Sequence, residues 1–238
     1  MVLKEVKEKP IIFIISHNRY TYLKKLIDRL LRLKQDKIVI VDNKSTYIPL
    51  LEFYDEIRST FDIIYMKENY RARRSMGKVF SEFKDKYNLA RDNYIYTDSD
   101  VVPDEECPED FVEVFSMILQ KYHVEKVAFG LRIDNLPDCF AGKNFIIKQQ
   151  KYRWESPFIK DFGIELKQGG TDTTFSYRRA NTIPGLTGNS IRTGRPYVAN
   201  HLPWYMDSDN LSEEEKYYFK TSSSNFSTFM RDMNRKWR

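Results

Sequence analysis

Residues 11–15 read Ile-Ile-Phe-Ile-Ile and are followed directly by the polar turn formers Ser16, His17 and Asn18. A continuous apolar run of this length predicts a strand that is buried on both faces. Between residues 20 and 34, Leu and Ile recur at the spacing of one helical face. The two patterns together predict a buried strand with a helix packed back against it.

The same alternation continues along the first half of the chain. Further apolar runs of strand length are separated by stretches in which apolar residues recur at helical spacing. The predicted strands are residues 38–41, 61–66, 94–97 and 126–131, and the predicted helices include residues 50–57, 76–87 and 111–122. Strands that alternate with helices are typical of an α/β fold with a mostly parallel central sheet flanked by helices.

Beyond the fifth predicted strand the periodicity fades into loops and short strands such as residues 173–177. A chain of 238 residues with 41% hydrophobic residues can bury a sizeable core as a single elaborated domain. We therefore expect one domain over residues 1–238. It would comprise a first half at about 11–131, a second half at about 132–205 and a C-terminal helical tail at about 206–238.

Composition limits the classes of partner and compartment. The net charge of +5 comes from 39 basic against 34 acidic residues, which fits an anionic ligand without requiring a nucleic acid. Cys107 and Cys139 stand far apart and form no Cys-x-x-Cys pair, so neither a zinc ribbon nor a disulfide framework is expected. The first apolar run is too short to span a membrane. We expect a cytoplasmic protein.

Polar residues at the predicted strand ends mark the expected binding crevice, because ligands of open parallel sheets bind outside the carboxyl ends of the strands. Neither Gly-x-Gly-x-x-Gly after the first strand nor Gly-x-x-x-x-Gly-Lys-Ser/Thr occurs in the chain, so side chains would have to neutralise any phosphate group of a ligand. The residues predicted to bind the ligand in this crevice are Ser16, Asn18, Arg19, Asp42, Asn69, Arg71, Asp98 and Ser99.

Asp98 and Asp100 close the fourth predicted strand, two residues apart. Two hard oxygen ligands at this spacing can share Mn²⁺ or Mg²⁺, which also binds diphosphate oxygens. The alternative is a polar strand end before the turn at Pro103. The position of the triplet at the end of a buried strand favours the metal site.

These residues resemble the glycosyltransferases of the type A fold (GT-A), especially those of family 2, over roughly residues 11–205. The resemblance implies a nucleoside-diphosphate sugar donor, such as a UDP- or GDP-sugar, held by the loop after the first strand and by Asp42. It implies a divalent cation on Asp98 and Asp100. It also implies that residues of about 11–131 form a nucleotide-binding half and residues of about 132–205 an acceptor-side half. His201 matches the His that the fold often adds to the metal, although it could instead pack beside Trp204.

A catalytic base is implied as well, because an inverting transfer needs a carboxylate that deprotonates the acceptor hydroxyl. The candidates are Asp172 after a glycine pair, Glu155 beside Trp154, and Asp134. Each has a structural alternative, such as a turn cap at Asp172 or an ion pair between Asp134 and Arg132. The chain departs here from the common Glu-Asp pair of the family.

The sequence thus predicts a metal-dependent glycosyltransferase of the hexosyltransferase type, with a glycan, a lipid-linked molecule or a protein as the acceptor. The basic, aromatic stretch of residues 226–238 could make a peripheral membrane contact. One alternative is a sugar-phosphate nucleotidyltransferase, but the Gly-rich basic loop typical of those enzymes is missing after the first strand. The other alternative is a non-catalytic nucleotide- or carbohydrate-binding module. The missing Glu-Asp pair favours this alternative.

Overall fold

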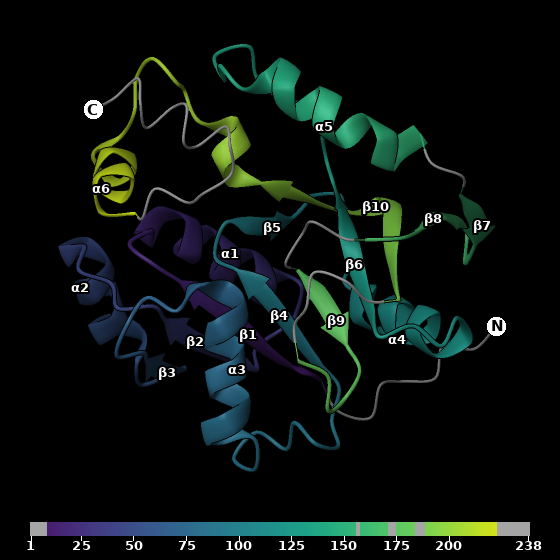
Figure 1. Ribbon diagram of the computed structural model, residues 1–238, viewed down its shortest axis with the longest axis horizontal. Coiled ribbons are helices and arrows are strands. Elements are labelled where there is room, and N and C mark those ends of the chain that lie inside the picture. The colour runs from purple at the N-terminus through teal and green to yellow at the C-terminus, as the bar shows by residue number, and fades with distance from the viewer. Residues whose placement is uncertain (1–8, 156–157, 171–174, 184–188, 223–238) are drawn as a thin grey trace.

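The structure is a computed structural model that describes residues 9–155, 158–170, 175–183 and 189–222 (Figure 1). Within these ranges the strands are β1 (Ile11–Ser16), β2 (Ile38–Asp42), β3 (Asp62–Tyr65), β4 (Tyr94–Asp98), β5 (Val101–Pro103), β6 (Lys126–Leu131), β7 (Ile159–Asp161), β8 (Ile164–Gln168), β9 (Ser176–Arg178) and β10 (Ser190–His201). The helices are α1 (Tyr20–Arg32), α2 (Ile48–Ile57), α3 (Arg71–Phe83), α4 (Phe111–Lys121), α5 (Lys143–Glu155), the 3-10 helix η1 (Leu202–Tyr205) and α6 (Glu213–Thr221).

The strands form one sheet in the order β3-β2-β1-β4-β9-β6-β10-β8-β7, and β5 pairs with β10 outside this path. Strands β1 to β4 are parallel to their neighbours among themselves, and β6 is parallel to β10. Strand β9 is inserted antiparallel between β4 and β6. The predicted α/β fold is confirmed, and its second half adds antiparallel pairs to the parallel framework.

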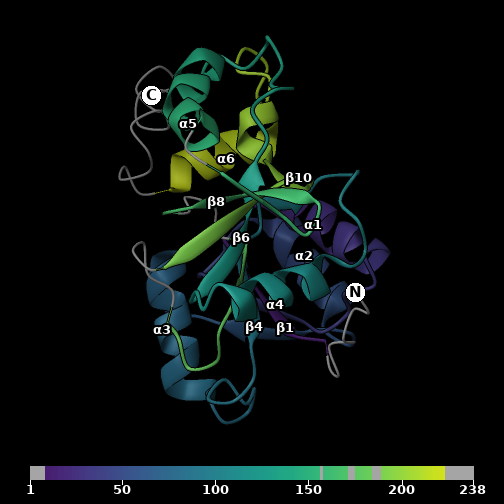
Figure 2. The same cartoon turned by 90° about the vertical axis from the view of Figure 1, so that its right-hand side faces the viewer.

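The position of strand β1 between two layers of helices explains why its sequence is apolar without interruption. Ile12 and Ile14 pack into the core on the side of α1, α2 and α4, whereas Phe13 and Ile15 pack on the side of α3. Figure 2 shows these helices on opposite sides of the sheet. Each buried side chain of this kind contributes about 1.5–3 kcal/mol to the free energy of unfolding, so both faces of the strand hold the fold together.

Several elements of the second half were not predicted. The region expected to consist of loops contains α5, whose weakly amphipathic sequence buries only Ile146 and Gln150. Strand β10 is long, and its pairing with β6 shifts register between Thr193 and Val198, which breaks the period-two pattern. The predicted strand 173–177 overlaps β9 at residues 176 and 177. Residues 173 and 174 lie outside the described residues.

The C-terminal part of the described chain carries α6, which lies in the predicted helical tail. Residues 223–238 lie outside the described residues, including the stretch expected to touch a membrane. Nowhere in the part of the chain that the structure describes is a helix both long and apolar enough to cross a bilayer.

Candidate active site

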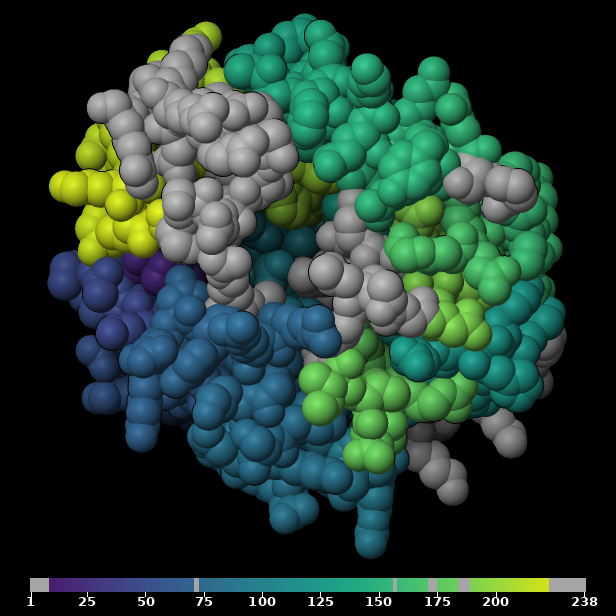
Figure 3. Space-filling view, viewed as in Figure 1, coloured from purple at the N-terminus to yellow at the C-terminus, as the bar shows by residue number. Residues whose placement is uncertain are grey.

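The polar residues at the end of β1 and those at the end of β4 meet at the topological switch point of the sheet. The chain passes from β1 to β2 on one side, and later enters β4 on the other side of β1. Ile15 pairs with Asp98, and the Ser99 N–H donates to the Ile15 carbonyl at 3.0 Å. Figure 3 shows a hollow beside α3, with the teal of the β4–β5 region at its floor. A crevice at this place is where α/β sheets bind ligands.

Asp100 lies at the centre of this arrangement. Its Oδ1 is 3.8 Å from His201 Nε2, and its Oδ2 is 3.6 Å from Arg19 Nη1. His201 lies beside Asp100 because β10 pairs antiparallel with β5 and because the Leu202 N–H donates to the Asp100 carbonyl at 2.8 Å. Oδ1 of Asp100 is buried and has no hydrogen-bond partner among the described residues. A buried carboxylate oxygen of this kind is suited to a cation.

His201 packs beside Trp204, as its sequence context allowed, and its role as a metal ligand stays a prediction. Its ring lies 4.7 Å from the ring of Trp204, centroid to centroid, while Nε2 faces Asp100. Packing against the Trp204 ring fixes the imidazole, and so orients its nitrogen toward the carboxylate.

A divalent cation at this place would need ligands from a substrate as well as from the protein. No group of three His, Cys, Asp or Glu side chains is gathered as a metal cluster within the described ranges. Mg²⁺ and similar cations at phosphate sites, however, use one or two carboxylates and take further ligands from the phosphates and water. Asp98 and Asp100 would hold such a cation, and His201 would supply an imidazole beside Asp100. These roles stay predictions.

Arg19 is a buried cation at the edge of the site. Its side chain is 3% exposed and its guanidinium lies 3.7 Å from the centroid of the Tyr218 ring and 4.8 Å from that of Tyr22. The 3.6 Å contact with Asp100 exceeds hydrogen-bond length, so the attraction is Coulombic. The two rings therefore hold a positive charge beside the carboxylate in one orientation.

Asn18 and Asp42 shape the crevice from inside. Asn18 Oδ1 accepts the N–H groups of Thr46 and Tyr47 at 2.7 and 3.0 Å. Asp42 accepts the Tyr54 hydroxyl at 3.0 Å through Oδ1 and the Ser45 N–H at 3.0 Å through Oδ2. Both side chains are buried. Their predicted contacts with the donor stay predictions, and the observed role is to fix the loop that follows β2.

The remaining predicted donor residues lie around the same strand ends. Ser16 and Ser99 are buried at the ends of β1 and β4. Asn69 precedes α3, and Arg71 is its first residue, although the side chain of Arg71 lies outside what the structure describes.

Helix α6 is a part of the site that sequence reasoning missed. Glu214 Oε2 accepts the N–H and the hydroxyl of Thr21 at 2.9 and 3.0 Å, and Glu215 accepts the Tyr22 hydroxyl at 2.9 Å. Asn18 Nδ2 donates to Thr221 Oγ1 at 3.0 Å. The capping box of Ser212 and Glu215 predicts the start of a helix, but no local pattern predicts where that helix docks.

The three candidate bases differ in their surroundings. Asp134 lies between Arg132, whose Nε is 3.2 Å from Oδ1, and Arg195. Burial raises the pKa of Asp134, but hydrogen bonds from Arg195 and Arg132 outweigh it and hold the pKa below its usual value. Glu155 is exposed and pairs with Lys151 at 3.4 Å. Asp172 lies outside the described residues.

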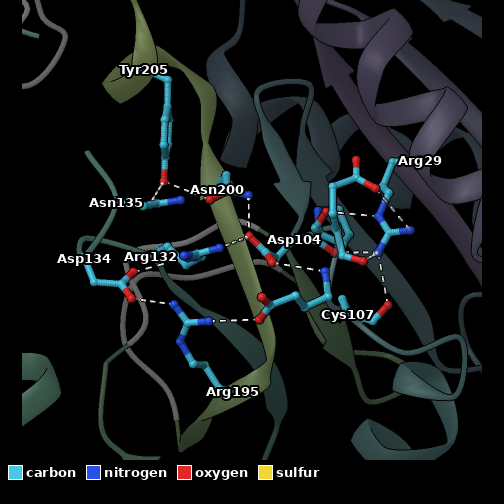
Figure 4. A network of polar contacts seen from close by, with 12 residues as sticks. Arg29, Asp104, Cys107, Arg132, Asp134, Asn135, Arg195, Asn200 and Tyr205 are labelled. Carbon is cyan, nitrogen blue, oxygen red and sulfur yellow. Dashed lines mark hydrogen bonds and ion pairs between the residues drawn. The ribbon is translucent and has the colours of Figure 1, made fainter. Parts of the chain in front are cut away.

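A polar network, also missed from the sequence, fixes the segment after the Asp-Ser-Asp triplet (Figure 4). Asp104 accepts hydrogen bonds from Arg132 Nη1 at 2.7 Å and from Asn200 Nδ2 at 2.9 Å. Arg29 of α1 donates to the carbonyls of Pro103 at 3.2 Å and Cys107 at 3.0 Å. The network ties β5 to α1, β6 and β10, and so holds the backbone next to Asp100.

The family described as "Glycosyl transferase family 2" matches residues 11–178, which is more than half of the chain. The chain belongs to glycosyltransferase family 2. Membership of this family implies a nucleotide-sugar donor and an acceptor. The matched residues run from β1 to β9 and include both aspartates of the Asp-Ser-Asp triplet.

No curated protein matches this glycosyltransferase. Among solved structures it is similar to a protein described as a glucose-1-phosphate thymidylyltransferase of Bacillus anthracis, crystallised with sucrose. The identity is 9% and the TM-score is 0.37. The alignment covers 52% of this chain and 56% of the other.

Proposed function

We propose that this glycosyltransferase moves a hexosyl group from a UDP- or GDP-sugar to an acceptor hydroxyl in a reaction that depends on Mn²⁺ or Mg²⁺. The observation that carries the proposal is the position of Asp98 and Asp100 at the switch point, where Asp100 faces both His201 and Arg19. The proposed acceptor is a glycan, a lipid-linked molecule or a protein, and the proposed compartment is the cytoplasm.

The bound cation would neutralise negative charge that develops on the leaving diphosphate. Asp98 and Asp100 would bind this cation, with His201 beside them. Arg19 is a second source of positive charge, and its stacking between Tyr22 and Tyr218 means that it need not reorganise during the reaction. The nucleoside would lie over the ends of β1 and β2, against the loop that Asn18 and Asp42 fix.

A carboxylate would then take the proton of the acceptor hydroxyl. Asp134 suits this role least among the three candidates, because its two arginine partners lower its pKa and weaken it as a base. Asp172 and Glu155 stay candidates, and substitution of each by its amide is the direct comparison.

Donor turnover with added Mn²⁺ tests the proposal. We expect Asp100→Ala to reduce turnover by about 100-fold or more, as loss of a group that stabilises transition-state charge does. Asp138→Ala is the matched control, since Asp138 is an exposed carboxylate whose partner is Lys143. Equal turnover in wild type and Asp100→Ala would contradict the metal role. Release of a nucleoside diphosphate supports glycosyl transfer, whereas pyrophosphate would identify a nucleotidyltransferase.

A further inference from the structure

A cavity of about 540 Å³ lies between the segment that follows β6, α5, the β7–β8 hairpin and β10. Its lining includes Trp154, Val198 and Lys160. The volume is that of a pocket for a small molecule. None of the roles proposed above for the donor or the metal uses this cavity.

Strand register places the cavity beside the donor crevice. Tyr96 of β4 and Ala128 of β6 both pair with Ser176 of the intervening strand β9, and paired residues point to the same face of a sheet. Two residues further along the parallel strands, Asp98 and Gly130 therefore lie on the same face of the sheet. Two strand spacings, about 10 Å, separate Tyr96 from Ala128 across β9.

Trp154 forms the wall of the cavity above Gly130. A Cβ at Gly130 would lie 2.8 Å from Trp154 Cη2, so the indole packs directly on the glycine backbone. The indole N–H donates to the Leu131 carbonyl at 3.1 Å and fixes the ring. A fixed, half-buried aromatic face in a cavity is a platform for a flat, partly apolar ligand.

The charged lining is nearly balanced. Arg132, Lys160 and Arg195 are basic and Asp134 and Glu165 are acidic, which gives 3 − 2 = +1. Asp134 already pairs with both arginines. The lining therefore offers several hydrogen-bonding groups without a strong field of either sign. A charged ligand gains little from such a lining, whereas a neutral ligand with many hydroxyl groups gains hydrogen bonds to it.

We propose that this cavity binds a neutral sugar ring of the acceptor, with the ring stacked on Trp154 and its hydroxyls bonded to the charged lining. This inference rests on the proposed function and narrows its acceptor to a carbohydrate-bearing molecule. The cavity lies next to the donor crevice on the same face, so a sugar held there presents a hydroxyl toward the site of transfer.

The test is saturation-transfer NMR on the full chain with a panel of neutral methyl glycosides of glucose, galactose, mannose and N-acetylglucosamine. Glucuronic acid and hexanol serve as the charged and the apolar probe. We expect at least one neutral glycoside to bind, with affinity at least tenfold weaker in Trp154→Ala. A second variant, Lys160→Trp, fills the mouth from an exposed position without removing core packing, and should weaken binding similarly.

Lys148→Trp makes the same change at an exposed lysine of α5 outside the cavity lining and should bind normally. Absence of binding by every neutral glycoside, binding that both cavity variants retain, or preference for hexanol or glucuronic acid would overturn the inference. Binding of UDP- and GDP-sugars with Mn²⁺ is measured on the same samples. If those donors bind and no glycoside does, the acceptor inference fails alone; if no donor binds, the proposed function fails.

Discussion

At the residue scale, His17 in the loop after β1 makes the stability of the fold depend on pH. Burial lowers the pKa of His17 more than the nearby Asp42 carboxylate raises it. The unfolded chain therefore binds a proton near the ordinary pKa of about 6.5, while the folded chain still resists it. The contribution of His17 to the free energy of unfolding is fully present above that pH. It is lost as the pH drops from about 6.5 toward the lower pKa of the folded chain.

Urea unfolding at pH 7.5 and pH 5.5 measures this effect. We expect the free energy of unfolding of His17→Gln to decrease less between the two pH values than that of wild type. His123→Gln is the control, because His123 is exposed and should leave the wild-type difference unchanged. An identical pH dependence in wild type and His17→Gln would contradict the assignment.

Gly130 is a second position of interest, because neighbouring atoms leave no room for a side chain there. A Cβ there would lie 2.6 Å from the Thr193 carbonyl oxygen as well as against Trp154. We expect Gly130→Ala to lower the free energy of unfolding by about 1–3 kcal/mol, because backbone must shift to admit the methyl group. Gly77→Ala in α3 has nothing within 4 Å of its Cβ and should be neutral or stabilising by up to about 1 kcal/mol. Chemical denaturation of both variants decides the matter, and equal effects would refute this account.

At the scale of elements, α1 lacks an N-terminal cap of its own. Arg19 supplies no side-chain cap, and the first turn of α1 contains no acidic residue. Glu214 of α6 accepts the Thr21 N–H instead. A carboxylate at this end of a helix satisfies a free N–H group and opposes the helix dipole.

Glu214→Ala should therefore lower the free energy of unfolding by about 1–3 kcal/mol, since it removes the charged acceptor of the part-buried Thr21 N–H hydrogen bond. Glu213→Ala changes a neighbouring exposed residue whose partner is Lys216, and should change stability by less than about 0.5 kcal/mol. Thermal unfolding compared by calorimetry gives the result. If the two variants have the same midpoint, α6 does not cap α1.

Elements with a regular apolar period could be predicted from sequence, and others could not. β1 and α4 bury clear faces, so their patterns are visible in the residues themselves. In α5 most side chains face solvent, and β10 changes register midway, so neither keeps one period. The Asp-Ser-Asp triplet could be placed because it ends a regular strand. Arg29 and Glu214 could not, because their partners lie far away in the sequence.

At the scale of the whole molecule, the proposed donor links binding to global stability. A ligand that binds only the folded chain adds about 2.7 kcal/mol at 100 times its Kd. We expect a UDP- or GDP-sugar with Mn²⁺ to raise the midpoint of thermal unfolding by several degrees. The rise should be smaller without Mn²⁺ and largely absent in Asp100→Ala. A full rise in that variant would show that the donor binds elsewhere.

The docking of α6 on the loop after β1 also sets an order of events during synthesis. Glu214 and Thr21 are separated by 193 positions, so the loop after β1, a part of the proposed donor site, leaves the ribosome long before α6 exists. At about 5–20 residues per second, the wait is roughly 10–40 s. The proposed donor crevice is therefore complete only after α6 has been made.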